Sequence, residues 1–216
     1  MISEPKKQLA HILWIGGATD TGKSTIAQNL ATRHDMYVYH YDQTDSDHHM
    51  KLAETVSEIQ KFNDASLDER WVIPEPKAMF ERSLFSFSRR FSLVIEDLLD
   101  FPNDQPIIAE GFGLLPELVR PMLSSYHQAI WFVPTESFKR DSMERRGKPS
   151  FGKLTSNPEK TKTNLFTRDM MLADYYRKQV SSYGYTLYEI DGSRSAEQMT
   201  DLVEAHFAKY LPILAR

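Results

Sequence analysis

The chain contains no cysteine, and this absence removes several kinds of chemistry. It excludes a disulfide framework, a thiolate metal site and a cysteine nucleophile. A protein that stays in a reducing compartment has no need of disulfides, so the composition fits a cytoplasmic location.

The chain also lacks a long apolar run, since no stretch approaches the ~20 residues that span a bilayer. A basic pair, Lys6 and Lys7, precedes the apolar residues 9–15 and superficially resembles a secretory signal. That apolar stretch is short, contains His11 and lacks a small-residue cleavage site. We therefore expect a buried first strand, no membrane partner and a cytoplasmic protein.

Neither sign of charge dominates: 26 Lys and Arg residues stand against 30 Asp and Glu residues, for a net charge of −4. This balance argues against a surface that coats nucleic acid, while it leaves a local basic cleft open. With 216 residues and 41% hydrophobic residues, the chain can form a single globular domain over residues 1–216. A domain of this size folds without structural metal.

Apolar patterning predicts strands that alternate with helices. The predicted strands lie at 9–16, 36–41, 107–109, 129–133 and 185–190; the predicted helices lie at 22–33, 50–62, 77–100, 116–124, 136–146, 160–181 and 195–210. This alternation predicts an α/β protein whose parallel sheet is covered on both faces. The crossover before the third strand spans about sixty residues, which predicts a separate lobe over the sheet edge. Residues 64–75 and 147–158 are expected to be loops.

The strongest motif is G-x-x-x-x-G-K-[ST], and it lies between the first predicted strand and the first predicted helix. In such a loop, backbone N–H groups surround phosphate oxygens at the positive end of the helix. Lys23 is expected to reach the β- and γ-phosphates of ATP, and Ser24 to bind Mg²⁺. The expected nucleotide-binding residues are Gly17, Ala18, Thr19, Asp20, Thr21, Gly22, Lys23, Ser24 and Thr25.

The motif and the order of elements resemble the branch of P-loop proteins that contains small-molecule and nucleoside monophosphate kinases. The specific match covers residues 9–42; beyond it, Glu110-Gly111 and residues 189–193 fit the pattern. The resemblance implies a three-layer fold with five parallel strands in the order 2-3-1-4-5. It also implies an acceptor-binding lobe (residues 44–104), an arginine-rich lid (residues 140–158), and adenine contacts at Gly192 and Ser193. The lobe and the lid match no individual member, and Glu110 stands where an Asp is frequent.

Two carboxylates are candidates for the reaction itself. Asp42 follows the second strand, where the acceptor-facing carboxylate of this branch lies, and is expected to take the proton of the attacking hydroxyl. Capping of the next helix, or simply facing solvent, is the alternative, and Asp45 and Asp47 are competing candidates. Glu110 ends a buried strand and is expected to orient water bound to Mg²⁺ or the acceptor, with Gly111 allowing close approach; a satisfied structural carboxylate is the alternative. His48 and His49 point apart on a helix and indicate a solvated helix start instead of a metal site.

Arginines form two candidate groups. Arg140, Arg145 and Arg146 precede the flexible loop, and a closing lid could bring them to the phosphates; a solvated helix end is the alternative. Arg82 and Arg89 lie seven residues apart on one helix face and could bind an anionic acceptor, although such charges usually face solvent. Weaker candidates on the next helix are Arg168 and Arg177.

The function predicted from these features is transfer of the γ-phosphate of Mg·ATP to a small hydroxylated or phosphorylated acceptor. A GTPase is disfavoured because the chain has no N-K-x-D motif, and a motor ATPase because no hydrophobic run ends in Asp-Glu. A nucleotide-binding scaffold, or a weak ATPase without an acceptor, stays open. Both a monomer and a homodimer fit the sequence.

Overall fold

Five parallel strands form one sheet in the computed structural model, which describes residues 7–102 and 105–212. The strands are β1 (Ile12–Gly17), β2 (Tyr37–His40), β3 (Ile107–Glu110), β4 (Ala129–Pro134) and β5 (Thr186–Ile190). Their order is β2-β3-β1-β4-β5, and every neighbouring pair is parallel. This order confirms the α/β fold that the resemblance implied. Lys6 and residues 103 and 104 of the expected lobe lie outside the described residues.

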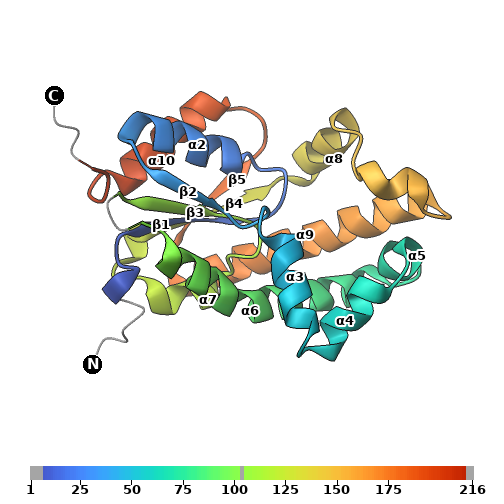
Figure 1. The fold of residues 1–216 in the computed structure, drawn as a ribbon. Coiled ribbons are helices and arrows are strands. Elements are labelled where there is room, and N and C mark those ends of the chain that lie inside the picture. The colour runs from blue at the N-terminus through green and yellow to red at the C-terminus, as the bar shows by residue number, and fades with distance from the viewer. Residues whose placement is uncertain (1–6, 103–104, 213–216) are drawn as a thin grey trace.

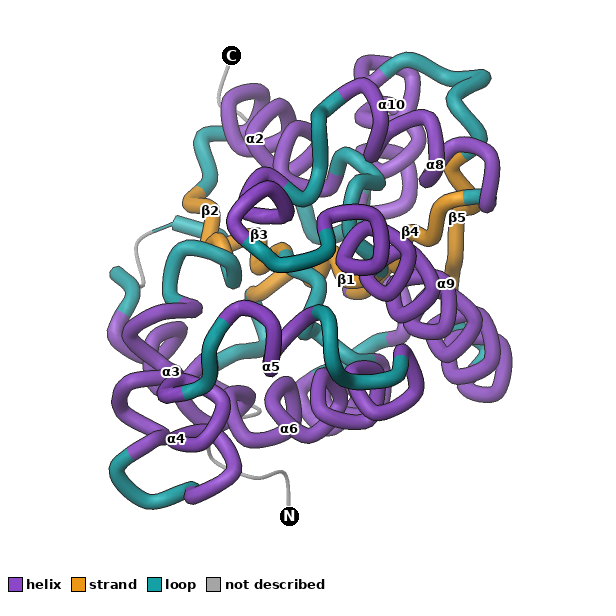
Figure 2. The backbone as a smooth tube through the Cα atoms, turned by 90° about the vertical axis from the view of Figure 1, so that its right-hand side faces the viewer, coloured by secondary structure: helices purple, strands orange, loops and turns teal. Residues whose placement is uncertain are grey.

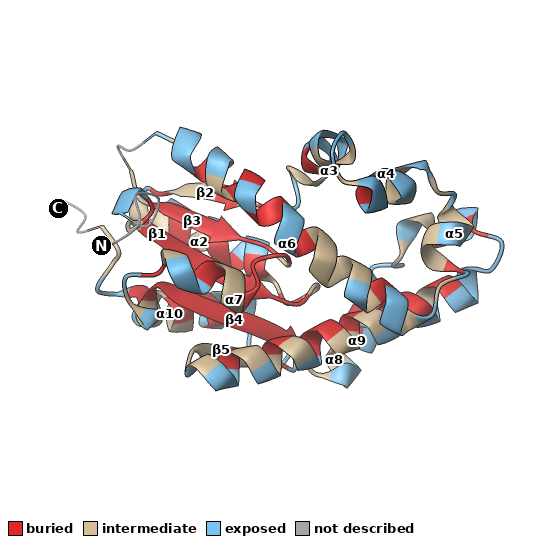
Figure 3. Ribbon diagram, turned by 90° about the horizontal axis from the view of Figure 1, so that it is seen from below, coloured by how far each residue is buried: buried red, intermediate tan, exposed pale blue. Residues whose placement is uncertain are grey.

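Helices cover both faces of the sheet (Figure 1). One face packs against α2 (Lys23–His34) and α10 (Ala196–Phe207), and the other against α6 (Pro76–Asp100), α7 (Pro116–Val119) and α9 (Pro158–Tyr183). Because both faces are covered, all residues of β1, β3 and β4 are buried (Figure 3). Trp14 and Trp131 lie in the core beneath α6 and α9, and Phe132 lies in the core beneath α2 and α10.

The two long helices begin and end where proline and glycine place them. Pro76 and Pro158 occupy first-turn positions, where the missing N–H has no intrahelical partner to lose. α6 ends at Asp100 because Phe101, which precedes Pro102, is extended. α9 ends at Tyr183, and Gly184 caps it with a φ of 67° that favours glycine.

The segment between β2 and α6 differs from its prediction. One helix was expected at 50–62, but the chain forms α3 (Asp45–Ala53) and α4 (Ser57–Asp64), because Val56 between them is extended. The loop expected at 64–75 contains α5 (Leu67–Trp71), which begins with a capping box of Ser66 and Glu69. His48 was expected in a solvated helix start but is buried and paired with Asp97. In Figure 2 these three helices lie below the strand ends.

Two further segments also correct the sequence prediction. The helix expected at 116–124 consists of the short α7 followed by a 3-10 turn, Arg120–Met122, because Pro121 cannot donate an α-helical hydrogen bond. The expected loop after α8 (Glu136–Arg145) contains a further 3-10 turn, Ser150–Leu154. Within the parts of the chain that the structure describes, no helix has the length and hydropathy needed to cross a membrane.

Arg90 of α6 is fully buried and joins α6 to the segment after β2. Its guanidinium lies 3.8 Å from the centre of the Tyr41 ring and donates to the Tyr41 carbonyl and to Asp45. Its neighbour Arg89 is exposed and stacks on Phe85.

We expect Arg90→Ala to lower the free energy of unfolding by about 2–4 kcal/mol, because it empties a packed site and leaves the Tyr41 carbonyl without this donor. Arg89→Ala is the matched control on the same helix and should change it by less than ~0.5 kcal/mol. Urea unfolding followed by circular dichroism measures both variants. Equal stability of the two would show that Arg90 does not hold this segment.

Candidate active site

The phosphate loop (residues 17–24) connects β1 to α2. Gly17 and Gly22 have φ values of 115° and 82°, and a Cβ on Gly17 would lie 2.0 Å from the Phe132 carbonyl oxygen. Glycine is therefore required at Gly17 by conformation and by space. α2 begins at Lys23 with no side-chain cap and no acidic residue in its first turn. The first turn of α2 thus adds no carboxylate of its own to the positive end of the helix, which suits an anion.

Lys23 is buried within this loop, with 6% of its surface exposed. Its ammonium donates to the Ala18 carbonyl at 2.7 Å and to Thr21 Oγ1 at 3.4 Å. Burial lowers the pKa of Lys23, and the nearby carboxylates Glu110, Asp42 and Asp20 act in the opposite direction. Ser24 and Thr25 are exposed in the first turn of α2.

A buried lysine of α8 ties the phosphate loop to α9. Lys139 Nζ lies 2.7 Å from Asp20 Oδ2, 2.6 Å from Asp169 Oδ2 and 2.7 Å from Thr19 Oγ1. Thr19 also donates to Asp169 at 3.0 Å. The side chains of Lys139 and Asp20 are each 2% exposed, so water cannot replace these partners. We call Asp20, Lys139 and Asp169 the ion bridge.

Two cations of the expected lid reach the same loop. Arg146 and Lys148 lie 3.2 Å and 2.8 Å from Asp20 Oδ1. Burial raises the pKa of Asp20, but Lys139 and Lys148 outweigh burial and lower that pKa to about 2. The structure places Arg140 elsewhere, against Glu136 and the Phe166 ring. Arg145 is exposed and makes no hydrogen bond or ion pair with any described residue.

The carboxylates predicted for the reaction lie at the ends of β2 and β3. Glu110 is buried and pairs with His40 Nδ1 at 2.7 Å across the β2–β3 junction. Asp42 reaches solvent, but neighbouring protein atoms remove part of the water around its carboxyl group, and this desolvation raises its pKa. The ammonium of Lys23 opposes the increase. Both carboxylates act on Lys23, so the structure brings these three predicted residues together.

The oxygen ligands at the carboxyl ends of the strands are too few to hold Mg²⁺ by themselves, but they suit Mg²⁺ that is bound together with a nucleotide. The described residues contain no group of three His, Asp or Glu side chains that could hold a metal ion. Ser24, exposed at the helix start, and the nearby Glu110 and Asp42 are oxygen donors, which Mg²⁺ prefers. Mg²⁺ usually keeps few protein ligands and completes its shell with phosphates and water.

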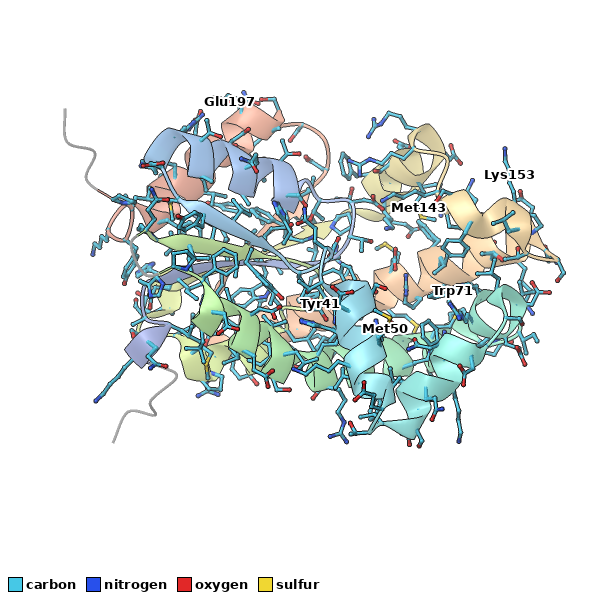
Figure 4. All side chains as sticks on the ribbon, viewed as in Figure 1. Tyr41, Met50, Trp71, Met143, Lys153 and Glu197 are labelled. Carbon is cyan, nitrogen blue, oxygen red and sulfur yellow. The ribbon has the colours of Figure 1, made fainter. Side chains whose placement is uncertain are left out.

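A cavity of about 650 Å³ borders the phosphate loop at Thr19. Its walls come from α3, α4, α5, α6, α9 and the segment after β3, and its volume is that of a small-molecule site. Trp71 extends from α5 toward α9 (Figure 4), where Asn164 donates to its carbonyl at 3.1 Å. The aromatic lining residues are Phe62, Trp71, Phe85, Phe87 and Phe112.

The remaining predicted residues occupy different positions. Arg82 lines the cavity, as does the weaker candidate Arg168, whereas Arg89 does not. Gly111 is packed against Tyr41, whose Cβ would lie 2.2 Å from an added Cβ, so this glycine serves packing. Arg177 pairs with Asp174 and Glu189 away from the cavity.

The loop expected at adenine follows β5. Gly192 lies against the Phe138 ring of α8, and Ser193 is exposed and bonded to Asp191.

Sequence reasoning missed Lys139, Lys148, Asp169 and Trp71 as site residues. Lys139 and Asp169 lie inside amphipathic helices, where spacing does not reveal which charge faces another element. Trp71 did carry a signal, because an aromatic residue in the polar segment 64–75 needs a packing partner.

No family model matches the chain, and no curated protein sequence matches it. Solved structures that are similar to it include a deoxyadenosine kinase from M. mycoides, at 12% identity and a TM-score of 0.49, covering 92% of this chain and 99% of that one. A gluconokinase from Sinorhizobium meliloti 1021 shares 14% identity, with a TM-score of 0.40 and coverage of 93% and 92%. An uncharacterized protein from Eubacterium ventriosum ATCC 27560 shares 15% identity, with a TM-score of 0.42 and coverage of 92% and 98%. At these values the likeness concerns the fold alone.

The lowered pKa of Asp20 predicts acid sensitivity. A carboxylate whose folded pKa lies below its unfolded value stabilises the fold above about pH 4 and loses this contribution as the pH falls toward 2. We expect the free energy of unfolding of wild type to exceed that of Asp20→Asn by about 2 kcal/mol at pH 6 and by about half of that at pH 3. Asp141→Asn, exposed on α8, is the control. Urea unfolding at both pH values measures the difference, and a pH-independent difference would contradict the assignment.

Proposed function

We propose that the protein transfers the γ-phosphate of Mg·ATP to the hydroxyl or phosphate oxygen of a small acceptor that binds in the cavity. The observation that carries this proposal is that the phosphate loop opens at Thr19 onto a cavity of about 650 Å³ with an aromatic lining. An enzyme that only hydrolyses ATP needs room for water there and no built second site. Lys23, Asp42 and Glu110 lie at the same strand ends.

The residues have separate parts in this reaction. The acceptor oxygen attacks the γ-phosphorus, the bond from that phosphorus to the bridging oxygen breaks, and ADP leaves. Asp42 takes the proton of an attacking hydroxyl, since its carboxylate is accessible from solvent and its raised pKa makes it a better proton acceptor. Lys23 exchanges the Ala18 carbonyl for phosphate oxygens, and Arg146 and Lys148 turn from Asp20 to the charge that develops on the transferred group.

The proposed nucleotide complex uses the phosphate loop, with Gly192 and Ser193 near the base. Ser24 is the proposed protein ligand of Mg²⁺. Glu110 is proposed to orient water bound to Mg²⁺ or the acceptor. When bound, Mg²⁺ neutralises charge on the β- and γ-phosphates. Closure of residues 140–158 over the phosphates would exclude water from the reacting oxygens.

The proposal predicts that acceptors stimulate ADP release and that Asp42→Asn removes this stimulation. We expect acceptor-dependent turnover to fall on the order of 10²-fold or more, because the amide cannot take the proton in the transition state. The Kd for Mg·ATP should stay within about threefold. A coupled assay of ADP release, with and without a panel of hydroxylated and phosphorylated acceptors, measures the effect.

Asp64→Asn is the control, because Asp64 is exposed at the end of α4 and outside the cavity. Stimulation that persists undiminished in Asp42→Asn would remove Asp42 from the mechanism. If no acceptor across a broad panel stimulates the wild type, the protein is a nucleotide-binding scaffold or a weak ATPase.

A further inference from the structure

Three arginines gather around two aromatic rings in the wall of the cavity. The guanidinium carbons of Arg70 and Arg82 lie 5.1 Å and 4.6 Å from the centre of the Phe62 ring. Those of Arg82 and Arg168 lie 5.6 Å and 5.8 Å from the centre of the Trp71 ring. Arg82 and Arg168 come from α6 and α9, so two separate helices direct their charges to the same indole ring. We call Arg70, Arg82 and Arg168 the guanidinium cluster.

Carboxylates do not balance the charge of this cluster. Arg168 pairs with Asp169 at 2.7 Å, but Lys139 shares that carboxylate. Arg82 donates to the Arg70 carbonyl at 2.7 Å, and Arg70 donates to a backbone carbonyl, that of Asn63. Over the described residues, neither Arg70 nor Arg82 forms an ion pair, and Arg70 Nε is buried without a partner. Burial, together with Arg168 and Arg70, lowers the pKa of Arg82.

The other acidic groups that line the cavity are committed or exposed. Asp45 pairs with Arg90 and with His49 at 3.3 Å. Glu58 is exposed and bonded to Ser57, and Glu81 is exposed, 3.8 Å from Lys77. His49 is itself occupied, because its Nε2 lies 2.9 Å from Ser86 Oγ. Arg82 therefore lines the cavity as a partly desolvated cation without a carboxylate partner among the described residues, which favours a ligand that carries an oxyanion.

The remaining lining residues are mostly apolar and indicate which kind of ligand framework the cavity can hold. Phe85, Phe87 and Phe112 form an apolar wall with Ile59 and Leu172. Phe87 and Phe112 meet edge to face, with ring centres 5.3 Å apart, so their arrangement is fixed by packing. Such a surface stabilises a flat ring and offers few hydrogen bonds to a sugar.

We propose that the cavity binds a molecule that combines a planar ring with a compact oxyanion, a phosphate monoester or a carboxylate, and that Arg82 and Arg168 hold the oxyanion beside Trp71. Its role as phosphate acceptor rests on the proposed function, but its binding does not. Thr19 of the phosphate loop lines the same cavity as Arg82 and Arg168, so a molecule held by these arginines lies beside the loop.

The test is equilibrium binding without nucleotide, followed by fluorescence. Trp71 is the partly exposed tryptophan at the cavity, whereas Trp14 and Trp131 are buried in the core. Phenyl phosphate and benzoate carry the ring and each oxyanion, phenol carries the ring alone, and ribose 5-phosphate carries the phosphate without a planar ring. We expect phenyl phosphate or benzoate to bind about tenfold or more tightly than phenol and ribose 5-phosphate. Which of the two binds more tightly identifies the oxyanion.

Arg82→Gln should weaken binding of that probe about tenfold or more, and Arg89→Gln, on the same helix outside the cavity, should leave it unchanged. Arg82→Lys keeps the charge but loses the planar fork, so it should weaken binding less; it replaces Arg82→Gln if that variant melts early. Three results would overturn the proposal: equal binding of phenol, equal binding of ribose 5-phosphate, or an Arg82-independent signal that inorganic phosphate displaces, which places the probe in the phosphate loop. ADP release by the same preparation tests phosphoryl transfer separately.

Discussion

Lys139 is buried between Asp20 of the phosphate loop and Asp169 of α9, and the arrangement of the site depends on this ion bridge. An ammonium that has lost its hydration must keep both carboxylates, because leaving one such charge unpaired costs about 3–5 kcal/mol. The bridge therefore fixes β1, α8 and α9 relative to one another at the strand ends. Thr19 and Asp169 also line the cavity, so the phosphate loop and the cavity share a wall. A ligand that displaces Thr19 or Asp169 would therefore change both the phosphate loop and the cavity.

The fold could be predicted from the sequence because it depends on local signals that agree with one another. Apolar strands ending in glycine or proline, helices at 3.6-residue spacing and the motif at Gly17 each predicted their element. The strand order came from the resemblance alone, and the sheet confirms it. Errors arose where the local signal was weak: no glycine or proline marks the break at Val56, and α5 occupies a segment that composition indicated to be a loop.

The candidate site could be predicted only where a motif carried it. Lys23 and Asp42 follow strands and Glu110 ends one, so the parallel sheet brings them to one edge. The arginines of α6 show the limit of spacing: Arg82 and Arg89 share a face by count, yet one lines the cavity and the other is exposed. Arg89 and Arg90 are adjacent, and the second is fully buried. The surroundings of these arginines are set by residues distant in sequence, such as Trp71 and Tyr41. Helical spacing cannot reveal such contacts.

The fate of the γ-phosphate tests the central claim, that the loop and the cavity form one phosphotransferase site. The protein is incubated with ATP labelled in the γ-phosphate and with ring-bearing acceptors that carry an oxyanion and a hydroxyl, and the products are separated by chromatography. The account predicts that label leaves ATP and appears in an organic phosphate, and that Lys23→Met reduces this product on the order of 10²-fold or more. Label that appears only in inorganic phosphate, or that stays in ATP with every acceptor, would contradict it.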